Sequence, residues 1–142
     1  MTVVLDAYAV IAALLGERAR ADVEPLLADG VVSAPNVAEI LDVCIRVHAN
    51  NERVVRERLD WLAGGGLEML PLGAELAREA GVLRAKYYKR RHCEVSLGDC
   101  VALALAKQRQ APLATSDPDL ASAAREERVE VLALPDSSGK RP

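Results

Sequence analysis

The sequence contains no phenylalanine, and aromatic residues make up only 3% of its 142 residues. Its core must therefore be packed mainly from leucine, valine, isoleucine and alanine. Hydrophobic residues account for 51% of the sequence and charged residues for 27%. A chain of this length and composition is typical of one soluble, globular domain with one complete core.

Cysteine and histidine are scarce as well. The three cysteines (Cys44, Cys93 and Cys100) form no CxxC pair, and the two histidines (His48 and His92) lie far apart. This spacing excludes the usual zinc sites. Cysteines without a pairing pattern are typical of a reducing compartment. We expect Cys44 and Cys100, which stand in apolar helical patterns, to be small core residues.

Long apolar runs and a strong net charge are also missing. No apolar run reaches the ~18 residues of a membrane-spanning helix, and the first residues do not form a signal-peptide pattern. We therefore expect a cytoplasmic protein with no membrane partner. The formal net charge is −3, so any nucleic-acid binding must rely on a local basic patch or on metal ions.

Short apolar segments alternate with amphipathic segments along the chain. We predict strands at 2–6, 31–33, 67–72, 111–116 and 129–134. We predict helices at 7–16, 18–30, 35–49, 51–66, 73–92, 96–110 and 117–127. This alternation predicts an α/β domain with a mainly parallel central sheet flanked by helices. We assign residues 1–135 to the domain and 136–142 to a flexible C-terminal tail.

Acidic residues stand at the ends of two predicted strands. Asp6 closes the first strand, and Asp117 and Asp119 follow the fourth in the segment APLATSDPDL. Ligands of parallel sheets bind beyond the carboxyl ends of the strands, so we expect these acids at one edge of the sheet. Glu39 and Asp99 lie near the N-termini of two helices, beside apolar faces where an ionised carboxylate needs a partner.

Carboxylates gathered in one place repel one another unless a cation neutralises them. Mg²⁺ and Mn²⁺ prefer oxygen ligands, and a metal held by carboxylates can activate water and stabilise charge on a phosphodiester. Each acid also has a structural interpretation. Asp117 before proline is a good helix N-cap, and Asp99 in a first helical turn is favoured by the helix dipole. Asp42, which shares a helix face with Glu39, is interpreted as a solvated or salt-bridged neighbour.

Four segments carry these acids along the chain: VVLDAYAVIAAL, SAPNVAEILDV, SLGDCVALALA and LATSDPDL. In this order they resemble the four acidic motifs of PIN-domain ribonucleases, and most closely those of VapC-type toxins from VapBC toxin–antitoxin pairs. The resemblance implies a PIN-like three-layer sandwich and a type II toxin. It implies an endoribonuclease that cleaves RNA with water activated by Mg²⁺ or Mn²⁺. It further implies a cognate antitoxin protein as partner and a homodimer.

The resemblance assigns the catalytic role to four acids: Asp6, Glu39, Asp99 and Asp117. Among them it implies that Asp6, Asp99 and Asp117 are the metal ligands. Thr115 matches the hydroxyl residue of the family's fourth strand, and the additional acid Asp119 is expected to support the site. Tyr8 stands where many family members carry serine or threonine, which leaves a direct role of that position in doubt.

A basic segment, KYYKRRH at 86–92, mixes cations with aromatic residues. Lys89, Arg90 and Arg91 are candidates for contacts with RNA phosphates. The same cations also suit the C-terminal turn of a helix, and the sequence does not decide between these interpretations. Trp61 is interpreted as a core residue or an interface anchor.

Two other functions stay open from the sequence. A receiver-like, Mg²⁺-binding signalling domain also places acids at strand ends. It would need a phosphoacceptor aspartate in the third strand, and the segment LEMLPLG has none. A PIN-fold module that works only through protein partners would keep the fold without catalysis.

Overall fold

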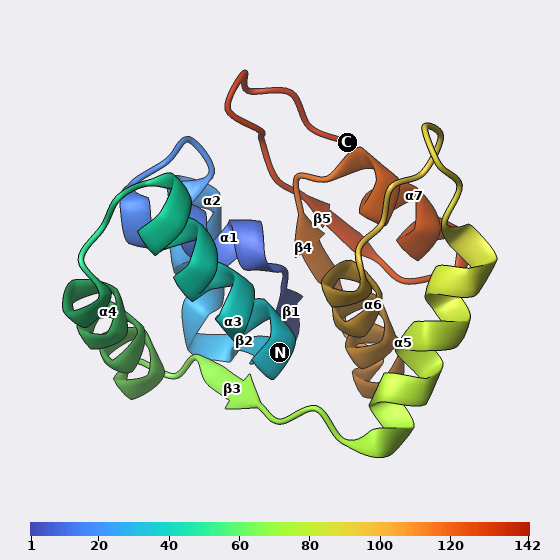
Figure 1. The fold of residues 1–142 in the computed structure, drawn as a ribbon, viewed down its shortest axis with the longest axis horizontal. Coiled ribbons are helices and arrows are strands. Elements are labelled where there is room, and N and C mark those ends of the chain that lie inside the picture. Colours follow the sequence, from blue (N-terminus) through green and yellow to red (C-terminus); the bar gives the residue numbers. More distant parts are fainter.

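Short runs rich in valine and leucine form the centre of the computed structural model, which describes residues 1–142 (Figure 1). The sheet has five strands in the order β3-β2-β1-β4-β5, and every neighbouring pair is parallel. The predicted α/β fold with a parallel central sheet is confirmed. The strands are β1 (Val3–Leu5), β2 (Gly30–Ser33), β3 (Glu68–Leu70), β4 (Leu113–Thr115) and β5 (Val131–Ala133).

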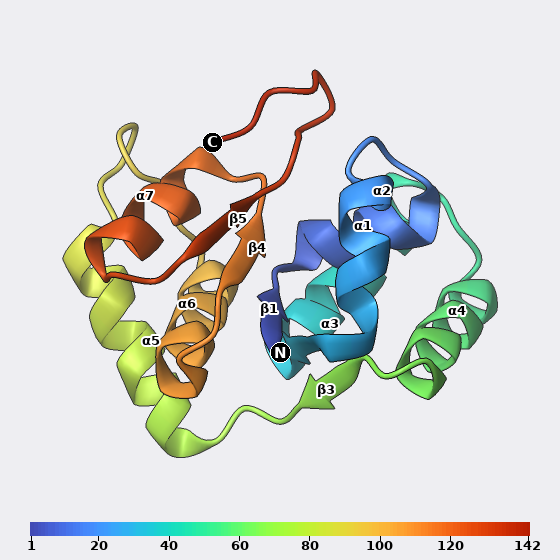
Figure 2. The same ribbon diagram turned by 180° about the vertical axis from the view of Figure 1, so that it is seen from behind.

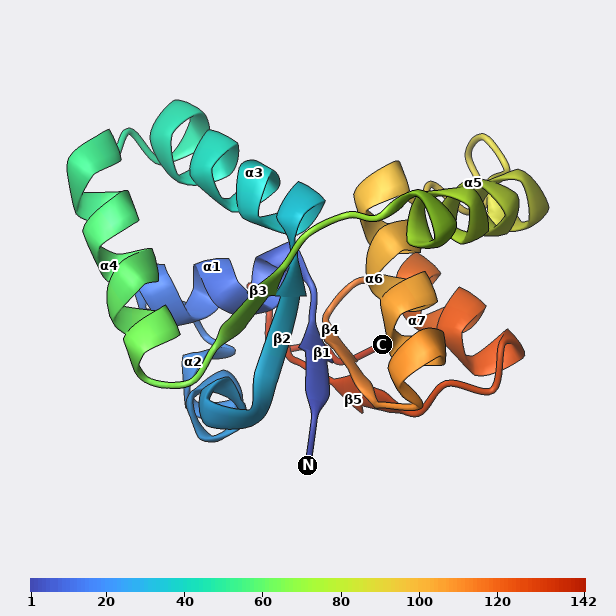
Figure 3. The same ribbon diagram turned by 90° about the horizontal axis from the view of Figure 1, so that it is seen from below.

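Helices cover both faces of this sheet and make it the middle of three layers (Figures 1 and 3). One layer holds α1 (Ala7–Leu15), α2 (Arg20–Val23) with the 3-10 helix η1 (Glu24–Asp29), α3 (Ala34–Asp42) with the π-helix η2 (Val43–Val47), and α4 (Glu52–Gly64). The other layer holds α5 (Ala74–Tyr87), α6 (Leu97–Arg109) and α7 (Pro118–Glu126).

Alternating strand residues divide the core between these layers. Val3 and Leu5 belong to the apolar cluster on the α1–α4 side, whereas Val4 between them belongs to the cluster on the α5–α7 side. This follows from the period-2 alternation of side chains in a strand. Helix α6 is buried continuously from Cys100 to Ala106, which explains why its sequence is apolar nearly all round.

The order of the strands creates a switch point between β1 and β4. These strands pair through Val4 with Leu113 and Leu5 with Ala114. From β1 the chain continues to β2 and β3 on one side, and it later returns to β4 and β5 on the other. Helices therefore leave β1 and β4 toward opposite layers (Figure 2). Such a point opens a crevice at the carboxyl ends of the strands, where ligands of α/β proteins bind.

Three predicted helices differ from the observed ones. The segment 18–30 forms a short α2 and then a 3-10 helix. Pro25 stands at the start of that 3-10 helix, because proline lacks the amide hydrogen of a helix interior. The segment 35–49 ends in a π-helical turn. The helix predicted to reach residue 92 ends at Tyr87, because Tyr88 is extended and an antiparallel bridge then joins Lys89 to Cys93.

The last residues fold back along the carboxyl edge of the sheet. The Asp136 carboxylate accepts hydrogen bonds from the amides of Ser138 and Lys140, at 2.8 and 3.0 Å. Arg141 pairs with Asp22 of α2 at 2.9 Å. The assignment of 136–142 to a flexible tail outside the domain stays a prediction.

Glu127, just after α7, joins the three helices of its layer. Its carboxylate accepts hydrogen bonds from Lys86 at 2.7 Å, Tyr87 at 2.5 Å and Lys107 at 2.7 Å. The side chain is only 10% exposed. The two ammonium groups, Lys107 first, and the phenol lower the pKa of this carboxyl to about 2.

We expect Glu127→Gln to lower the free energy of unfolding by about 2–3 kcal/mol at pH 7. The folded pKa lies below the unfolded value, so the stabilisation is complete above pH ~4.5 and is lost as the pH falls toward ~2. Urea unfolding at pH 7 and pH 3 checks this. The neighbouring, exposed Glu126 forms no ion pair, and Glu126→Gln is the matched control. A Glu127→Gln deficit that stays constant between these pH values would contradict the ion-pair explanation.

Candidate active site

Asp6 follows β1 directly and is the N-cap of α1. Its carboxylate accepts a hydrogen bond from the amide of Ala9 at 2.8 Å, and the residue is only 3% exposed. Burial raises the pKa of Asp6 to about 7, because the charged form is poorly solvated there. The hydroxyl of Thr115 and the Ala9 amide lower this pKa, whereas the negative charges of Asp99 and Asp117 raise it.

Thr115, the last residue of β4, connects the first acid to the fourth. Its hydroxyl is a side-chain hydrogen-bond partner of Asp6 and accepts a hydrogen bond from the amide of Asp117 at 3.0 Å. The residue is fully buried. Asp117 is the N-cap of α7 and accepts hydrogen bonds from the amides of Asp119 and Leu120, at 2.7 and 3.2 Å. The capping interpretation of Asp117 is therefore confirmed, and this cap lies near Asp6.

Asp99 lies in the first turn of α6, where it forms a capping box with Ser96. The Ser96 hydroxyl accepts a hydrogen bond from the Asp99 amide at 3.0 Å, and the Asp99 carboxylate accepts one from the Ser96 amide at 2.8 Å. Burial raises the pKa of Asp99, the Ser96 contacts lower it, and the charge of Asp117 raises it again.

Asp6, Asp99 and Asp117 thus share one design. Each uses a carboxylate oxygen to cap the N-terminus of a different helix, α1, α6 or α7. The positive ends of three helix dipoles stabilise negative charge in the same region. The second oxygens of Asp99 and Asp117 accept no hydrogen bond from the chain, so they stay free to bind a ligand.

Glu39 approaches this region from α3. The residue as a whole is exposed, but its carboxyl group is partly shielded from water. This shielding and, second, the charge of Asp99 raise the pKa of Glu39, whereas a hydrogen bond with Asn36 lowers it. Asn36 is fully buried and was not singled out in the sequence. Its amide nitrogen donates to the carbonyl of Gly98 at 3.4 Å, and its oxygen accepts from the Ser33 hydroxyl at 2.7 Å. A polar residue three positions before Glu39, on the same helix face, was the available signal.

Asp42 and Asp119 have partners of their own. Asp42 forms a salt bridge with Arg46 at 2.7 Å, which confirms its interpretation as a salt-bridged neighbour. Asp119 lies in the first turn of α7, and its carboxylate accepts a hydrogen bond from the amide of Glu94 at 2.9 Å. Its negative charge also contributes to raising the pKa of Asp99.

The family model described as "PIN domain" matches residues 3–126. The chain belongs to the PIN domain family. The matched residues include Thr115 and the acids Asp6, Glu39, Asp99, Asp117 and Asp119. No curated protein matches the sequence significantly.

Solved structures of toxin–antitoxin proteins are similar to this PIN domain over most of its length. VapBC2 from Rickettsia felis, bound to a DNA fragment from its promoter, has a TM-score of 0.69 at 17% identity, covering 94% of this chain and 99% of its own. FitAcB from Neisseria gonorrhoeae has a TM-score of 0.64 at 26% identity, with coverages of 92% and 96%. The sarcin-ricin loop cleaving toxin VapC20 from Mycobacterium tuberculosis has a TM-score of 0.68 at 15% identity, with coverages of 86% and 95%.

The donor set of the PIN domain fits a hard divalent cation by its chemistry. The acids that converge here carry only oxygen ligands, and Asp6, Glu39, Asp99, Asp117 and Asp119 form no salt bridge with lysine or arginine. No three His, Cys, Asp or Glu side chains stand close enough to coordinate one ion without adjustment. Mg²⁺ keeps several of its water ligands, so it needs few direct protein contacts.

Two further groups of residues predicted from the sequence, Tyr8 and the cations Lys89, Arg90 and Arg91, have no hydrogen bond or salt bridge with the candidate acids. The Tyr8 hydroxyl donates a hydrogen bond to the carbonyl of Pro135 at 3.3 Å, so it contacts the start of the C-terminal segment. Lys89, Arg90 and Arg91 are exposed, and none of them forms a salt bridge. They lie after the end of α5, so they do not form the C-terminal turn of that helix.

No helix in the PIN domain has both the length and the apolar character needed to cross a membrane.

Proposed function

We propose that this PIN domain is a metal-dependent endoribonuclease and the toxin of a type II toxin–antitoxin pair. The main support is one observation at the switch point of the sheet: the negative charges of the helix-capping acids Asp99 and Asp117 raise the pKa of buried Asp6, and no cation of the chain forms a salt bridge with any of the three. The similarity to VapC20, described as a toxin that cleaves the sarcin-ricin loop, supports the same reaction class.

In this proposal Asp6, Asp99 and Asp117 hold Mg²⁺ or Mn²⁺, with Glu39 beside them. A divalent ion, when bound, supplies an activated water molecule and stabilises negative charge on the phosphodiester. The chain positions the ligands for this role. Thr115 holds Asp6 and Asp117 through one hydroxyl group, and Asn36 orients Glu39 while it contacts α6.

We assign phosphate contacts to Lys89, Arg90 and Arg91. Because these cations are exposed and unpaired, no intramolecular salt bridge must be broken before they bind RNA. Phosphate contacts of this kind give affinity that falls steeply with salt. These three cations also provide a local positive patch on a chain whose formal net charge is −3.

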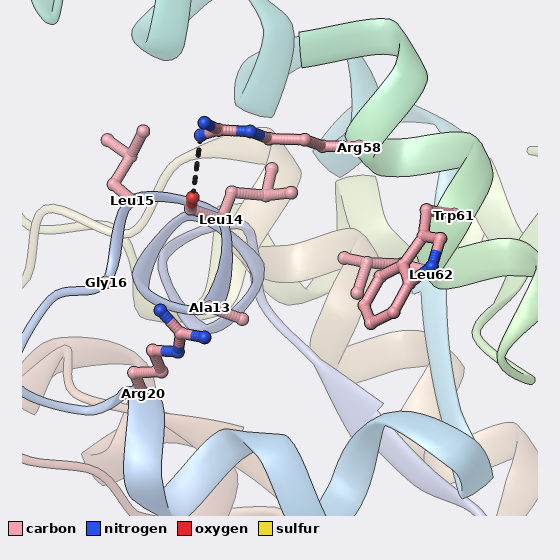
Figure 4. A pocket seen from close by; sticks show the side chains of 8 residues that line it. All are labelled: Ala13, Leu14, Leu15, Gly16, Arg20, Arg58, Trp61 and Leu62. Carbon is pink, nitrogen blue, oxygen red and sulfur yellow. Dashed lines mark hydrogen bonds between the residues drawn. The ribbon is translucent and has the colours of Figure 1, made fainter. Parts of the chain in front are cut away.

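The antitoxin is proposed to bind a groove between α1, α2 and α4, shown in Figure 4. The groove has a volume of about 390 Å³ and is lined by Ala13, Leu14, Leu15, Gly16, Arg20, Arg58, Trp61 and Leu62. Trp61 is 78% exposed, so its interpretation as a core residue is wrong, and we propose it as the anchor of this interface. Arg20 at one side already pairs with Glu24, whereas Arg58 at the other forms no salt bridge, so the apolar floor with Arg58 beside it fits an amphipathic antitoxin segment that carries an acidic residue.

One side of the groove is joined by a hydrogen bond, which the Arg58 guanidinium donates to the carbonyl of Leu14 at 3.1 Å (Figure 4). This bond ties α4 to the end of α1. The similar structures include toxin–antitoxin complexes, which supports a protein partner for this chain. A homodimer is proposed as well, and sedimentation of the purified protein decides it.

Removal of the metal tests the enzymatic proposal. We expect the purified chain to cut single-stranded RNA with added Mg²⁺ or Mn²⁺, to stop when EDTA is in excess, and to recover when the ion is restored. Asp99→Asn is expected to stay inactive with the ion present, because it loses a charged oxygen ligand. Persistent cleavage in EDTA would contradict metal dependence. Tight Mn²⁺ binding without any cleavage would instead favour a non-catalytic interaction module.

A further inference from the structure

The basic loop, defined as residues 88–95 between α5 and α6, is attached to α7 by one side chain. Asp119 accepts a hydrogen bond from the backbone amide of Glu94 at 2.9 Å, although the two residues are 25 positions apart. No other hydrogen bond joins this loop to α7. Besides the apolar packing of Cys93 and Val95 against the core, Asp119 therefore provides the one hydrogen-bonded link between the loop and α7.

Hydrogen bonds within the loop hold its residues together, so an anchor at one point can orient the segment they join. The amide of Lys89 donates to the carbonyl of Cys93 at 2.9 Å, and the amide of Cys93 donates back at 2.8 Å. Arg91 at its tip adopts a left-handed conformation with φ of 70°. On the other side, Arg84 of α5 donates a hydrogen bond to the carbonyl of Val95 at 3.1 Å.

The anchored amide lies next to the active-site acids. Glu94 comes two residues before Ser96, which forms the capping box with Asp99. Asp119 comes two residues after Asp117, and its own amide donates to the Asp117 carboxylate at 2.7 Å. One short hydrogen-bonded path therefore runs from the loop through Asp119 to Asp117.

We infer that Asp119 is a positioning residue, which holds the cations of the basic loop beside the acids and thereby sets the affinity for RNA. This inference rests on the proposed function, and it gives Asp119 a role other than metal support. The hydrogen bond accounts for one carboxylate oxygen. Without it the loop keeps its internal bonds and the packing of Val95 in the core, but it loses its hydrogen-bonded attachment to α7, and RNA binding must then order the free part again.

Two substitutions separate anchoring from charge. Asp119→Ala removes the acceptor, and we expect KM for single-stranded RNA to rise about fivefold to tenfold while kcat stays within about twofold. Asp119→Asn removes the charge but keeps an oxygen that accepts the same hydrogen bond, so we expect KM near the wild-type value. Asp60→Ala, which removes an exposed charge from α4 in the other helical layer, is the control and should leave KM unchanged.

If KM rises as much in Asp119→Asn as in Asp119→Ala, the inference is overturned, because the charge of Asp119 rather than its hydrogen bond would then determine the affinity for RNA. An unchanged KM in Asp119→Ala would overturn it as well. Hydrogen exchange of the Glu94 amide provides a readout that does not need catalysis. We expect at least about tenfold less protection in Asp119→Ala and wild-type protection in Asp119→Asn.

These measurements keep the two proposals apart. If the wild-type chain cuts no RNA, the proposed function fails, and the exchange of the Glu94 amide in the full chain still decides whether Asp119 anchors the loop. Equal protection in the wild type and Asp119→Ala would overturn the anchor even if RNA is cleaved. Thermal melting of each variant verifies that the remaining fold is intact.

Discussion

Replacing Asp6 by asparagine is expected to abolish RNA cleavage and, in the absence of metal, to stabilise the fold. The loss of activity follows from the loss of a charged ligand, because a bound ion supplies several kcal/mol of transition-state stabilisation. We expect a decrease of at least about 10³-fold in kcat/KM. The side chain keeps its size, and its oxygen can still accept the hydrogen bond from the Ala9 amide.

The gain in stability follows from the raised pKa of Asp6, about 7 compared with an ordinary value of 3.8. A carboxyl whose pKa is raised in the folded state does not lower the free energy of unfolding below pH ~4, where it is protonated in both states. Above that pH it lowers the free energy of unfolding increasingly, until the pH exceeds the folded pKa. Asp6→Asn removes this penalty. We expect the variant to be more stable by about 2–4 kcal/mol at pH 8 and equally stable at pH 4.

Urea unfolding between pH 4 and pH 8 in EDTA measures this difference. Asp60→Asn on α4 is the matched control, because Asp60 is exposed and forms no hydrogen bond or ion pair. Cleavage by Asp6→Asn at the wild-type rate would refute the assignment of the metal ligand. A stability gain of equal size at both pH limits would refute the explanation by burial of charge.

Replacing Trp61 by alanine is expected to weaken antitoxin binding by about 30-fold to 1,000-fold. A tryptophan in the middle of an interface is often worth about 2–4 kcal/mol. Trp61 is 78% exposed, so its removal should leave the free energy of unfolding nearly unchanged. The affinity for the antitoxin encoded in a neighbouring reading frame, measured by calorimetry, checks the prediction.

Val82→Ala provides the control for Trp61. Val82 lies on α5, in the other helical layer, and is 68% exposed. The substitution therefore removes a similarly exposed apolar side chain from a distant surface. We expect its antitoxin affinity to match that of the wild type. Equal losses in the two variants, or no loss in Trp61→Ala, would mean that the antitoxin binds elsewhere.

The same carboxylates of this PIN domain cap helices and are proposed to bind the metal. Asp117 is a helix N-cap as well as a proposed metal ligand, and Asp99 completes a capping box. The alternative interpretations drawn from the sequence were therefore not exclusive. Capping fixes the rotamers of these carboxylates, and a fixed orientation is what a metal ligand needs.

Local pattern was enough to predict much of this protein. Alternation of apolar strands with amphipathic helices determined the α/β class, since each element must bury its apolar face. The carboxyl ends of parallel strands lie at one edge, so the positions of Asp6 and Asp117 after their strands already placed both acids at that edge. The order of the acidic motifs indicated the family.

The tertiary structure alone decided which distant groups meet. Only the pairing of β1 with β4 places Asp6 near Asp117, with Thr115 between them. The contact of Asn36 with Gly98 and that of Asp119 with Glu94 join segments far apart in the chain. Periodicity specifies which face of an element is buried, but it carries no information about the partner that covers that face. Partners are selected by the packing of the whole chain.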